Sequence, residues 1–155
     1  MSSITTRPIS DAEILPACAH LLTDAYNAPP WHDAWTHEKA LEKLLCFYQS
    51  PKFMGWTAWQ DEVLIGCCVG NVEPYYTGDY FYLKEMFVSV QFQQRGAGTR
   101  LMAALRAELA VLDIRTIILF TGKDHFPFRF YQREGFAEMT DMRMMHLQAG
   151  EYIQA

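Results

Sequence analysis

The stretch from residue 80 to residue 112 constrains the fold more than any other part of the chain. Residues 80–90 are apolar and aromatic, a composition that favours a β-strand. Residues 100–112 carry leucines at helical spacing. Between them lies Gln-Gln-Arg-Gly-Ala-Gly-Thr, residues 93–99. The pattern predicts a strand that enters a glycine-containing loop, from which a helix begins.

A loop of this kind is suited to binding phosphate. The first backbone N–H groups of a helix have no partner within it, and they carry the positive end of the helix dipole. Gly96 and Gly98 allow a ligand to approach them closely. A P-loop would continue with Lys and Ser or Thr, but this chain has Thr99-Arg100. A dinucleotide-binding loop would need a third glycine where Leu101 stands.

Two motifs resemble those of one family. The pattern Gln-x-x-Gly-x-Gly at residues 93–98 resembles motif A of the GCN5-related N-acetyltransferases (GNAT), the loop that holds the pyrophosphate of acetyl-coenzyme A (acetyl-CoA). Residues 128–136 contain Phe-Tyr-x-x-x-Gly-Phe and resemble motif B of the same family. The resemblance covers residues 80–146, about half of the chain, and the first half resembles the family only in its order of elements.

The hydrophobic pattern predicts the order β-α-α-β-β-β-α-β-α-β, which is that of the GNAT fold. That fold is an α/β mixed sheet with a central splayed pair of parallel strands. We expect one N-acetyltransferase domain over residues 1–155. The expected strands are residues 4–9, 53–59, 63–72, 80–90, 116–121 and 137–147, and the expected helices are residues 10–27, 36–50, 99–113 and 124–135.

Composition excludes several classes of protein. Half of the residues are hydrophobic and a fifth are charged, which is typical of a globular chain. A net charge of −5 argues against a nucleic-acid binder. No apolar run reaches about 18 residues, and the first residues lack the pattern of a signal peptide, so we expect a cytoplasmic protein without a membrane segment.

The four cysteines have no metal-site spacing, so no metal is expected. The sequence leaves oligomeric state open, with a homodimer as one option.

Glu85 is the best candidate for a catalytic base. It lies midway along the apolar strand, where burial would raise its pKa toward neutrality. The GNAT family often keeps a Glu on this strand, acting directly or through water. The alternative is a structural carboxylate at the sheet rim, paired with Lys84 or another cation.

The resemblance also implies an acid. Tyr131 matches the family's tyrosine near the coenzyme sulfur, where its hydroxyl can protonate the departing thiolate. The alternative is a buried core tyrosine. Lesser acid–base candidates are Asp79, Glu73 and His125.

The resemblance implies that the coenzyme is bound mainly by the backbone. Phe87 and Val88 would offer main-chain groups to the pantetheine arm, and Phe128 would pack against it. The pyrophosphate would be wrapped by Gln93, Gln94, Arg95, Gly96, Ala97, Gly98 and Thr99. The family often has Asn where Asp124 stands, which puts that one contact in doubt.

The acceptor would be held by aromatic and acidic residues, a set suited to a cation. The main candidates are Trp31, Trp35, Tyr75 and Tyr80, joined by His32, Asp33 and Tyr76. Small polyamines, aminoglycoside-like amines and peptide amines all fit such a set.

These observations predict an acetyl-CoA-dependent N-acetyltransferase that acetylates a primary amine by direct attack in a ternary complex. One alternative is a non-catalytic acyl-CoA-binding regulatory module on the same fold. Another is a cysteine acyl-enzyme that uses Cys67 or Cys68, although no activating His–Asp or His–Asn set is evident around them.

Overall fold

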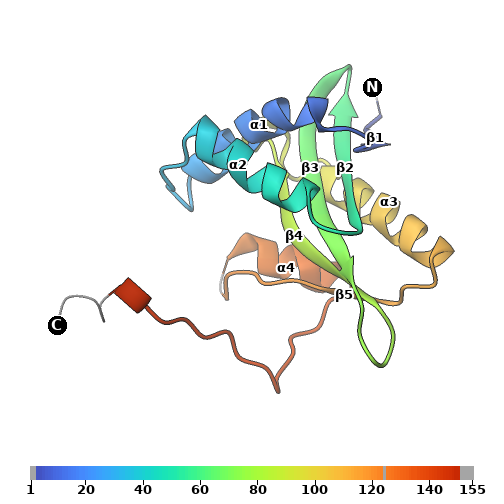
Figure 1. Ribbon diagram of the computed structural model, residues 1–155. Helices are drawn as coiled ribbons and strands as arrows, with labels where there is room; N and C mark the ends of the chain where they lie inside the picture. Colours follow the sequence, from blue (N-terminus) through green and yellow to red (C-terminus); the bar gives the residue numbers. More distant parts are fainter. Residues whose placement is uncertain (1–2, 124, 151–155) are drawn as a thin grey trace. The chain divides into compact units, whose positions relative to one another are not determined.

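The computed structural model describes residues 3–123 and 125–150. These residues form two compact units (Figure 1). The first unit extends to Phe120 and contains the sheet and three helices, and the second begins at Thr121 and contains one helix.

The first unit is built on a five-stranded sheet in the order β1-β2-β3-β4-β5. Its first four strands pair antiparallel, whereas β4 and β5 pair parallel. The mixed α/β sheet with one parallel pair is therefore confirmed. The strands are β1 (Thr5–Pro8), β2 (Phe53–Gln60), β3 (Val63–Glu73), β4 (Tyr80–Val88) and β5 (Thr116–Ile118).

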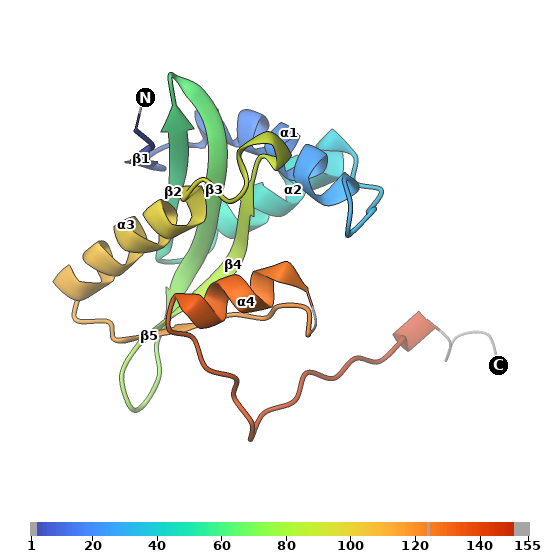
Figure 2. The same cartoon turned by 180° about the vertical axis from the view of Figure 1, so that it is seen from behind.

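Helices cover both faces of this sheet. Helices α1 (Leu15–Asn27) and α2 (His37–Tyr48) lie together on one face, and α3 (Ala97–Val111) lies on the other, as Figures 1 and 2 show from opposite sides. Two short 3₁₀ turns, Ala12–Ile14 and Val90–Phe92, lead into α1 and into the loop before α3.

Alternation along β3 supplies both layers of the core, because successive side chains of a strand point to opposite faces. Cys67 and Val69 are buried in the cluster formed with α1 and α2. Gly66 faces α3 instead, where an added Cβ would lie 3.2 Å from Leu101 Cδ1. The contact between α1 and α2 includes the stacked rings of His20 and His37, with centroids 3.7 Å apart.

A β-bulge bends the centre of the sheet. Val69 pairs with Glu85 but Gly70 pairs with Leu83, so Lys84 is an extra residue on β4. Gly70 is required there, because a Cβ at this position would lie 2.1 Å from the Tyr82 carbonyl oxygen.

The parallel pair is short. Residues 80–82 of β4 pair with β5, but residues 83–88 have no strand partner on that side among the residues that the structure describes. The parallel pairing therefore ends after residue 82 of β4, where β5 ends.

The second unit contains α4 (Phe126–Arg133). Gly135 ends the helix with φ +103°, the Phe136 N–H donates to the Tyr131 carbonyl at 2.9 Å, and the Gly135 N–H donates to the Gln132 carbonyl at 3.1 Å. This is the C-terminal glycine cap that the sequence predicts. His125 occupies the N-cap position, while Asp124, the predicted cap, lies outside the described residues.

The predicted last strand is wrong for the described residues. Residues 137–148 run without strand structure, and Met142, Met144 and Met145, predicted as core, are 62%, 75% and 88% exposed. Strand-forming residues make a strand only where a neighbouring chain satisfies their backbone hydrogen bonds. The strand before α4 is also shorter than predicted, since β5 ends at Ile118.

Candidate active site

Glu85 lies on the sheet face that α1 and α2 cover, beside the bulge in β4. Its side chain is 14% exposed, and its atom Oε1 lies 3.8 Å from Lys43 Nζ of α2. The other oxygen, Oε2, is buried and has no hydrogen-bond partner among the described residues. An unpaired buried carboxylate oxygen is costly, so it is a natural place for a ligand to donate a hydrogen bond.

The surroundings of Glu85 act on its ionisation in both directions. Burial is the largest influence and raises the pKa of Glu85 above its ordinary value, and the negative charge of Asp33 raises it further. The Lys43 ammonium and the nearby Tyr26 hydroxyl lower this pKa, but they do not cancel the effect of burial. The prediction of a buried carboxyl with a raised pKa is therefore confirmed.

The cation beside Glu85 comes from α2 rather than from its own strand. Lys84 Nζ lies over the Tyr82 ring, 3.7 Å from the centroid. Lys84 is the extra residue of the bulge, where the alternation of side chains is interrupted, and its ammonium is directed to the Tyr82 ring.

Aromatic rings surround the Glu85–Lys43 pair. Lys43 Nζ lies 5.2 Å from the centroid of Trp35 and 5.8 Å from that of Phe47. The Tyr26 ring meets Trp31 edge to face, with centroids 5.4 Å apart, and the Tyr26 hydroxyl donates to the Met86 carbonyl at 3.3 Å. Two of the four predicted acceptor-binding aromatics, Trp31 and Trp35, thus contact residues that surround the candidate base.

Trp35 is held firmly by the end of α1. The Asn27 side-chain amide donates to the Trp35 carbonyl at 3.0 Å, and the Trp35 backbone N–H donates to the Asn27 oxygen at 2.8 Å. The indole N–H donates to Asp33 at 3.2 Å. An open cavity of about 510 Å³ lies beside this loop and is lined by Asp33, Ala34, Trp35, Thr36 and Lys39.

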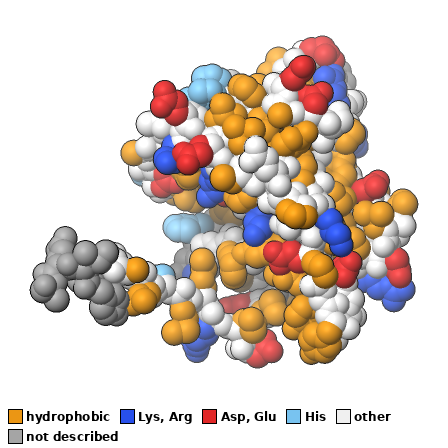
Figure 3. All heavy atoms as spheres, in the orientation of Figure 1, with side chains coloured by type: hydrophobic (Ala, Val, Ile, Leu, Met, Phe, Trp, Pro, Cys, Tyr) orange, Lys and Arg blue, Asp and Glu red, His pale blue; other side chains and the backbone are white. Residues whose placement is uncertain are grey.

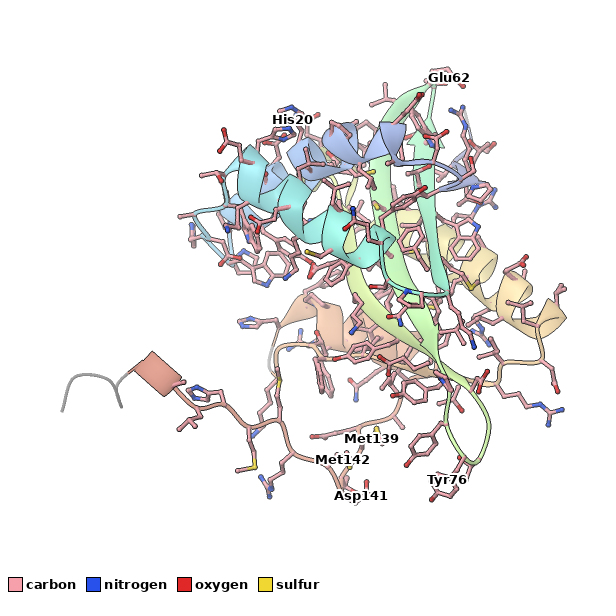
Figure 4. All side chains as sticks on the ribbon, in the orientation of Figure 1. His20, Glu62, Tyr76, Met139, Asp141 and Met142 are labelled. Atoms are coloured by element: carbon pink, nitrogen blue, oxygen red, sulfur yellow. The ribbon has the colours of Figure 1, made fainter. Side chains whose placement is uncertain are left out.

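The other two predicted aromatics lie elsewhere. Tyr75 and Tyr80 pack edge to face, with centroids 5.7 Å apart, and the Tyr80 hydroxyl donates to Glu73. Tyr80 begins β4, five residues before Glu85, which corresponds to roughly 17 Å along a strand. Tyr76, 87% exposed, lies in the loop after β3 at the opposite end of that strand from Glu62 (Figure 4). The structure thus divides the predicted acceptor set into two groups.

The loop after β4 has the geometry of a phosphate seat. Gly96 has φ +94° and immediately precedes α3, so no side-chain cap closes the start of this helix. A Cβ built on Gly96 meets no atom within 4 Å, which leaves open space beside the first N–H groups of α3. The pyrophosphate of a coenzyme fits a cradle of this kind.

Side chains of the loop have distinct contacts. The Gln93 amide donates to the Val88 carbonyl at 3.4 Å, and the Arg95 guanidinium lies 5.3 Å from the Phe92 ring centroid. Arg100 donates to the Ile4 carbonyl at 2.7 Å and ties α3 to the first strand. Arg95 is therefore the better placed of the two arginines to bind a phosphate.

The second unit carries the motif B residues. The Tyr131 ring packs edge to face against Phe130 and Phe136, with centroids 5.3 and 5.4 Å away. Phe128 and Tyr131 are both half-buried on α4, and the Phe128 N–H donates to the His125 carbonyl at 3.1 Å.

The structure disfavours a cysteine nucleophile. Cys67 and Cys68 are 0% and 1% exposed. A hydrogen bond with Cys18, together with burial, raises the pKa of Cys67 well above its usual value, and burial raises the pKa of Cys68 to about 12. A reactive cysteine needs an accessible thiolate, which neither residue provides.

Two residues of this site were missed from the sequence, Tyr26 and Lys43. The signal for Lys43 was available, because a cation between the apolar positions Leu41 and Leu44 of one helix points to a partner in its neighbourhood. Tyr26 gave no such signal, since its approach to β4 depends on how α1 lies across the sheet.

The described residues hold no group of three or more His, Cys, Asp or Glu side chains placed to bind a metal ion. They also include no helix long and apolar enough to span a membrane.

The fold is similar to that of solved acetyltransferases. The aminoglycoside N-acetyltransferase AAC(6')-Iy in complex with CoA is 20% identical, with a TM-score of 0.73 over 96% of this chain and 95% of that chain. An aminoglycoside acetyltransferase from an uncultured soil metagenomic sample, in complex with sisomicin, is 14% identical, with a TM-score of 0.70 over 94% and 96%. A GNAT family acetyltransferase of Staphylococcus aureus is 17% identical, with a TM-score of 0.69 over 95% and 100%.

No curated protein matches the chain. The family model described as the acetyltransferase (GNAT) family matches residues 15–136, well over half of the chain. The match includes the candidate base, the glycine loop and the Phe-Tyr-x-x-x-Gly-Phe motif, and the chain therefore belongs to the GNAT family of acetyl-CoA-dependent acetyltransferases.

Proposed function

We propose that this chain transfers an acetyl group from acetyl-CoA to a primary amine by direct attack in a ternary complex. Glu85 is the base and Tyr131 the acid. The observation that carries the proposal is the buried Glu85 carboxyl, with its raised pKa and an oxygen that no described group satisfies. It lies on the part of β4 where residues 83–88 have one edge without a strand partner in the described part of the chain.

A base is needed because the acceptor arrives as an ammonium ion. An alkyl amine with a pKa of about 10.4 pays roughly 4.6 kcal/mol to be neutral at pH 7. Glu85 accepts a proton from this amine, and the nitrogen then forms a bond to the thioester carbonyl carbon as the carbon–sulfur bond breaks. Tyr131 donates its hydroxyl proton to the departing thiolate, and the second proton that the nitrogen loses as the amide forms restores the Tyr131 hydroxyl. The pKa of Glu85, raised by burial, brings the base closer to the pH at which it works.

The coenzyme would lie along the unpaired edge of β4 and end at the loop before α3. Extended pantetheine can accept and donate hydrogen bonds at Phe87 and Val88 in the manner of an added strand. The first N–H groups of α3 and the open space at Gly96 support pyrophosphate binding there by residues 93–99. Phe128 would pack against the pantetheine arm.

Both compact units contribute to this proposal, Glu85 from the first and Tyr131 from the second. We therefore propose that residues 1–155 act as one N-acetyltransferase domain. The class of acceptor is a small or peptide amine bound near Trp31 and Trp35. The solved relative that holds sisomicin, an aminoglycoside acetyltransferase, supports an amine of this class.

The test is acetyl transfer to a panel of amines, measured by the release of the free thiol of coenzyme A. Glu85→Gln should abolish most turnover, whereas Glu62→Gln, at the exposed turn between β2 and β3, should leave it intact. Binding of acetyl-CoA without turnover on any amine would instead favour the non-catalytic acyl-CoA-binding module. No binding of acetyl-CoA at millimolar concentration would refute both functions.

A further inference from the structure

Charges of both signs lie around the candidate base. Asp33 and Glu85 are negative and Lys43 is positive, while Lys39 beside them is already paired with Glu42. Lys39 donates to Glu42 at 2.8 Å on the same helix. Figure 3 likewise shows acidic and basic side chains interspersed on the face that carries α1 and α2, rather than a patch of one sign. A site built for a polycation would be predominantly acidic.

The two oxygens of Glu85 differ in their surroundings. Oε1 lies 3.8 Å from Lys43 Nζ, whereas Oε2 has no hydrogen-bond partner among the described residues. An acceptor ammonium can therefore donate to Oε2 while Lys43 stays beside Oε1. Lys43 need not be expelled for an amine to bind.

An acceptor that is only a cation meets a cost in this arrangement. It places a second positive charge close to Lys43, and it leaves Lys43 to share a single carboxylate. An acceptor that also carries a carboxylate removes this cost, because its own negative charge can pair with Lys43. The side chain of Lys43 is 35% exposed and flexible, so its ammonium can turn toward such a group.

We propose that the acceptor is an amine that also bears a carboxylate, of the amino-acid class, with its amine at Glu85 and its carboxylate at Lys43. This rests on the proposed function, since it assumes that Glu85 receives the acceptor. Trp35 and Phe47, whose rings lie 5.2 and 5.8 Å from Lys43 Nζ, keep the ammonium on the side of the site where the carboxylate would arrive. Lys43 is then a specificity-determining residue.

The experiment compares amino acids with their carboxamides, which have the same side chain and amine but no carboxylate. For several amino acids, kcat/KM of the wild-type protein should be roughly 10- to 100-fold higher for the acid than for the amide, the span of a charge-assisted hydrogen bond. A carboxamide has the less basic amine, so amine basicity works against this order. The preference therefore reports the carboxylate.

Two variants assign the preference to Lys43. Lys43→Met keeps the aliphatic stem and should bring the ratio of acid to amide close to one, mainly through KM. Lys43→Arg keeps the charge and should retain most of the ratio. Because each ratio is taken within one variant, a change in the ionisation of Glu85 cancels from it. Thermal melting of each variant shows that it is folded.

The outcomes separate this inference from the proposed function. Acetylation of amides or polyamines at equal or higher kcat/KM than amino acids would overturn the inference and leave the function standing. A preference for acids that Lys43→Met does not change would overturn the role of Lys43. Acetylation of no amine at all would remove the proposed function itself.

Discussion

Lys43 Nζ lies 3.8 Å from Oε1 of Glu85, and this pair joins α2 to the centre of the sheet. Burial raises the pKa of Glu85, while Lys43 and the Tyr26 hydroxyl lower it. A base must be deprotonated to work yet basic enough to take a proton. The pKa of Glu85 results from these opposing influences, and it decides how well both requirements are met.

Tyr26→Phe should move the acidic limb of the pH profile to higher pH. The hydroxyl of Tyr26 lowers the pKa of Glu85, so its removal leaves the carboxyl protonated over a wider range. The midpoint of the rise of kcat/KM with pH should therefore increase. Tyr48→Phe is the matched control, because Tyr48 packs against Phe53 on the far end of α2. An unchanged midpoint in Tyr26→Phe would show that Glu85 does not govern this limb.

Glu85→Gln should not destabilise the fold at neutral pH, although it removes activity. Because burial raises the pKa of Glu85 in the folded state, the folded protein binds this proton more tightly than the unfolded chain does. The ionised carboxylate therefore costs stability above the raised pKa, and the cost disappears as the pH falls below the unfolded value of about 4.5.

Thermal melting across pH tests whether ionised Glu85 lowers the stability of the fold. The melting temperature of Glu85→Gln should equal or exceed that of the wild type at pH 7, and the two should converge near pH 4. A variant that melts well below the wild type at pH 7 would mean that the pair with Lys43 outweighs the cost of burying Glu85. In the expected case Glu85 lowers stability while it serves catalysis, which is common at catalytic groups.

The sequence predicted the order of elements up to α4 and the glycine loop because each depends on local patterns. The loop has glycine at residue 96, where φ is +94°, and Thr36 caps α2 by accepting from the Lys39 N–H at 3.1 Å, as its position predicted. The prediction of the last strand was wrong because that strand depends on non-local partners. Its methionines favour burial, but whether residues 137–148 pair with a strand depends on partners that local sequence does not specify.

The site was predictable only in part for the same reason. Glu85 was evident as a carboxylate inside an apolar strand. The division of the aromatic set depends on which end of β4 each loop reaches, and Tyr75 and Tyr80 gather at the end away from Trp35. The place of Lys43 between apolar positions of α2 indicates a nearby partner, but its pairing with Glu85 arises from the packing of α2 on the sheet.

Gly70→Ala should destabilise the protein strongly. The added Cβ would lie 2.1 Å from the backbone oxygen of Tyr82, in the bulge that bends β4, and a backbone atom cannot move aside. We expect a loss of roughly 1–3 kcal/mol or more in the free energy of unfolding. Gly66→Ala on the same strand is the control, because its nearest atom is the end of the Leu101 side chain at 3.2 Å. Denaturant unfolding that ranks the two variants equally would contradict the bulge geometry.

Gly96→Ala should weaken the binding of coenzyme A. Gly135→Ala is the matched control, because both glycines have positive φ, at +94° and +103°, and open space around the added Cβ. Both variants should lose stability by about 1–2 kcal/mol. Only Gly96 lies beside the first N–H groups of α3, so only its variant should raise the dissociation constant measured by calorimetry. Equal affinity in the two variants would place the pyrophosphate elsewhere.

Tyr131→Phe should lower kcat by roughly 10- to 10³-fold, the span usual for a general acid, with little change in coenzyme affinity. The substitution keeps the ring that packs against Phe130 and Phe136, so folding should be preserved and only the hydroxyl is lost. Tyr76→Phe removes a hydroxyl from an 87% exposed ring and should leave kcat unchanged. In the variant the thiolate must leave without this proton. Acyl donors with a more acidic thiol should therefore be less affected by the substitution, because their thiolates need less assistance. Full turnover of Tyr131→Phe with chemistry shown to be rate-limiting would limit this tyrosine to a packing role, and Glu85 would then act without it.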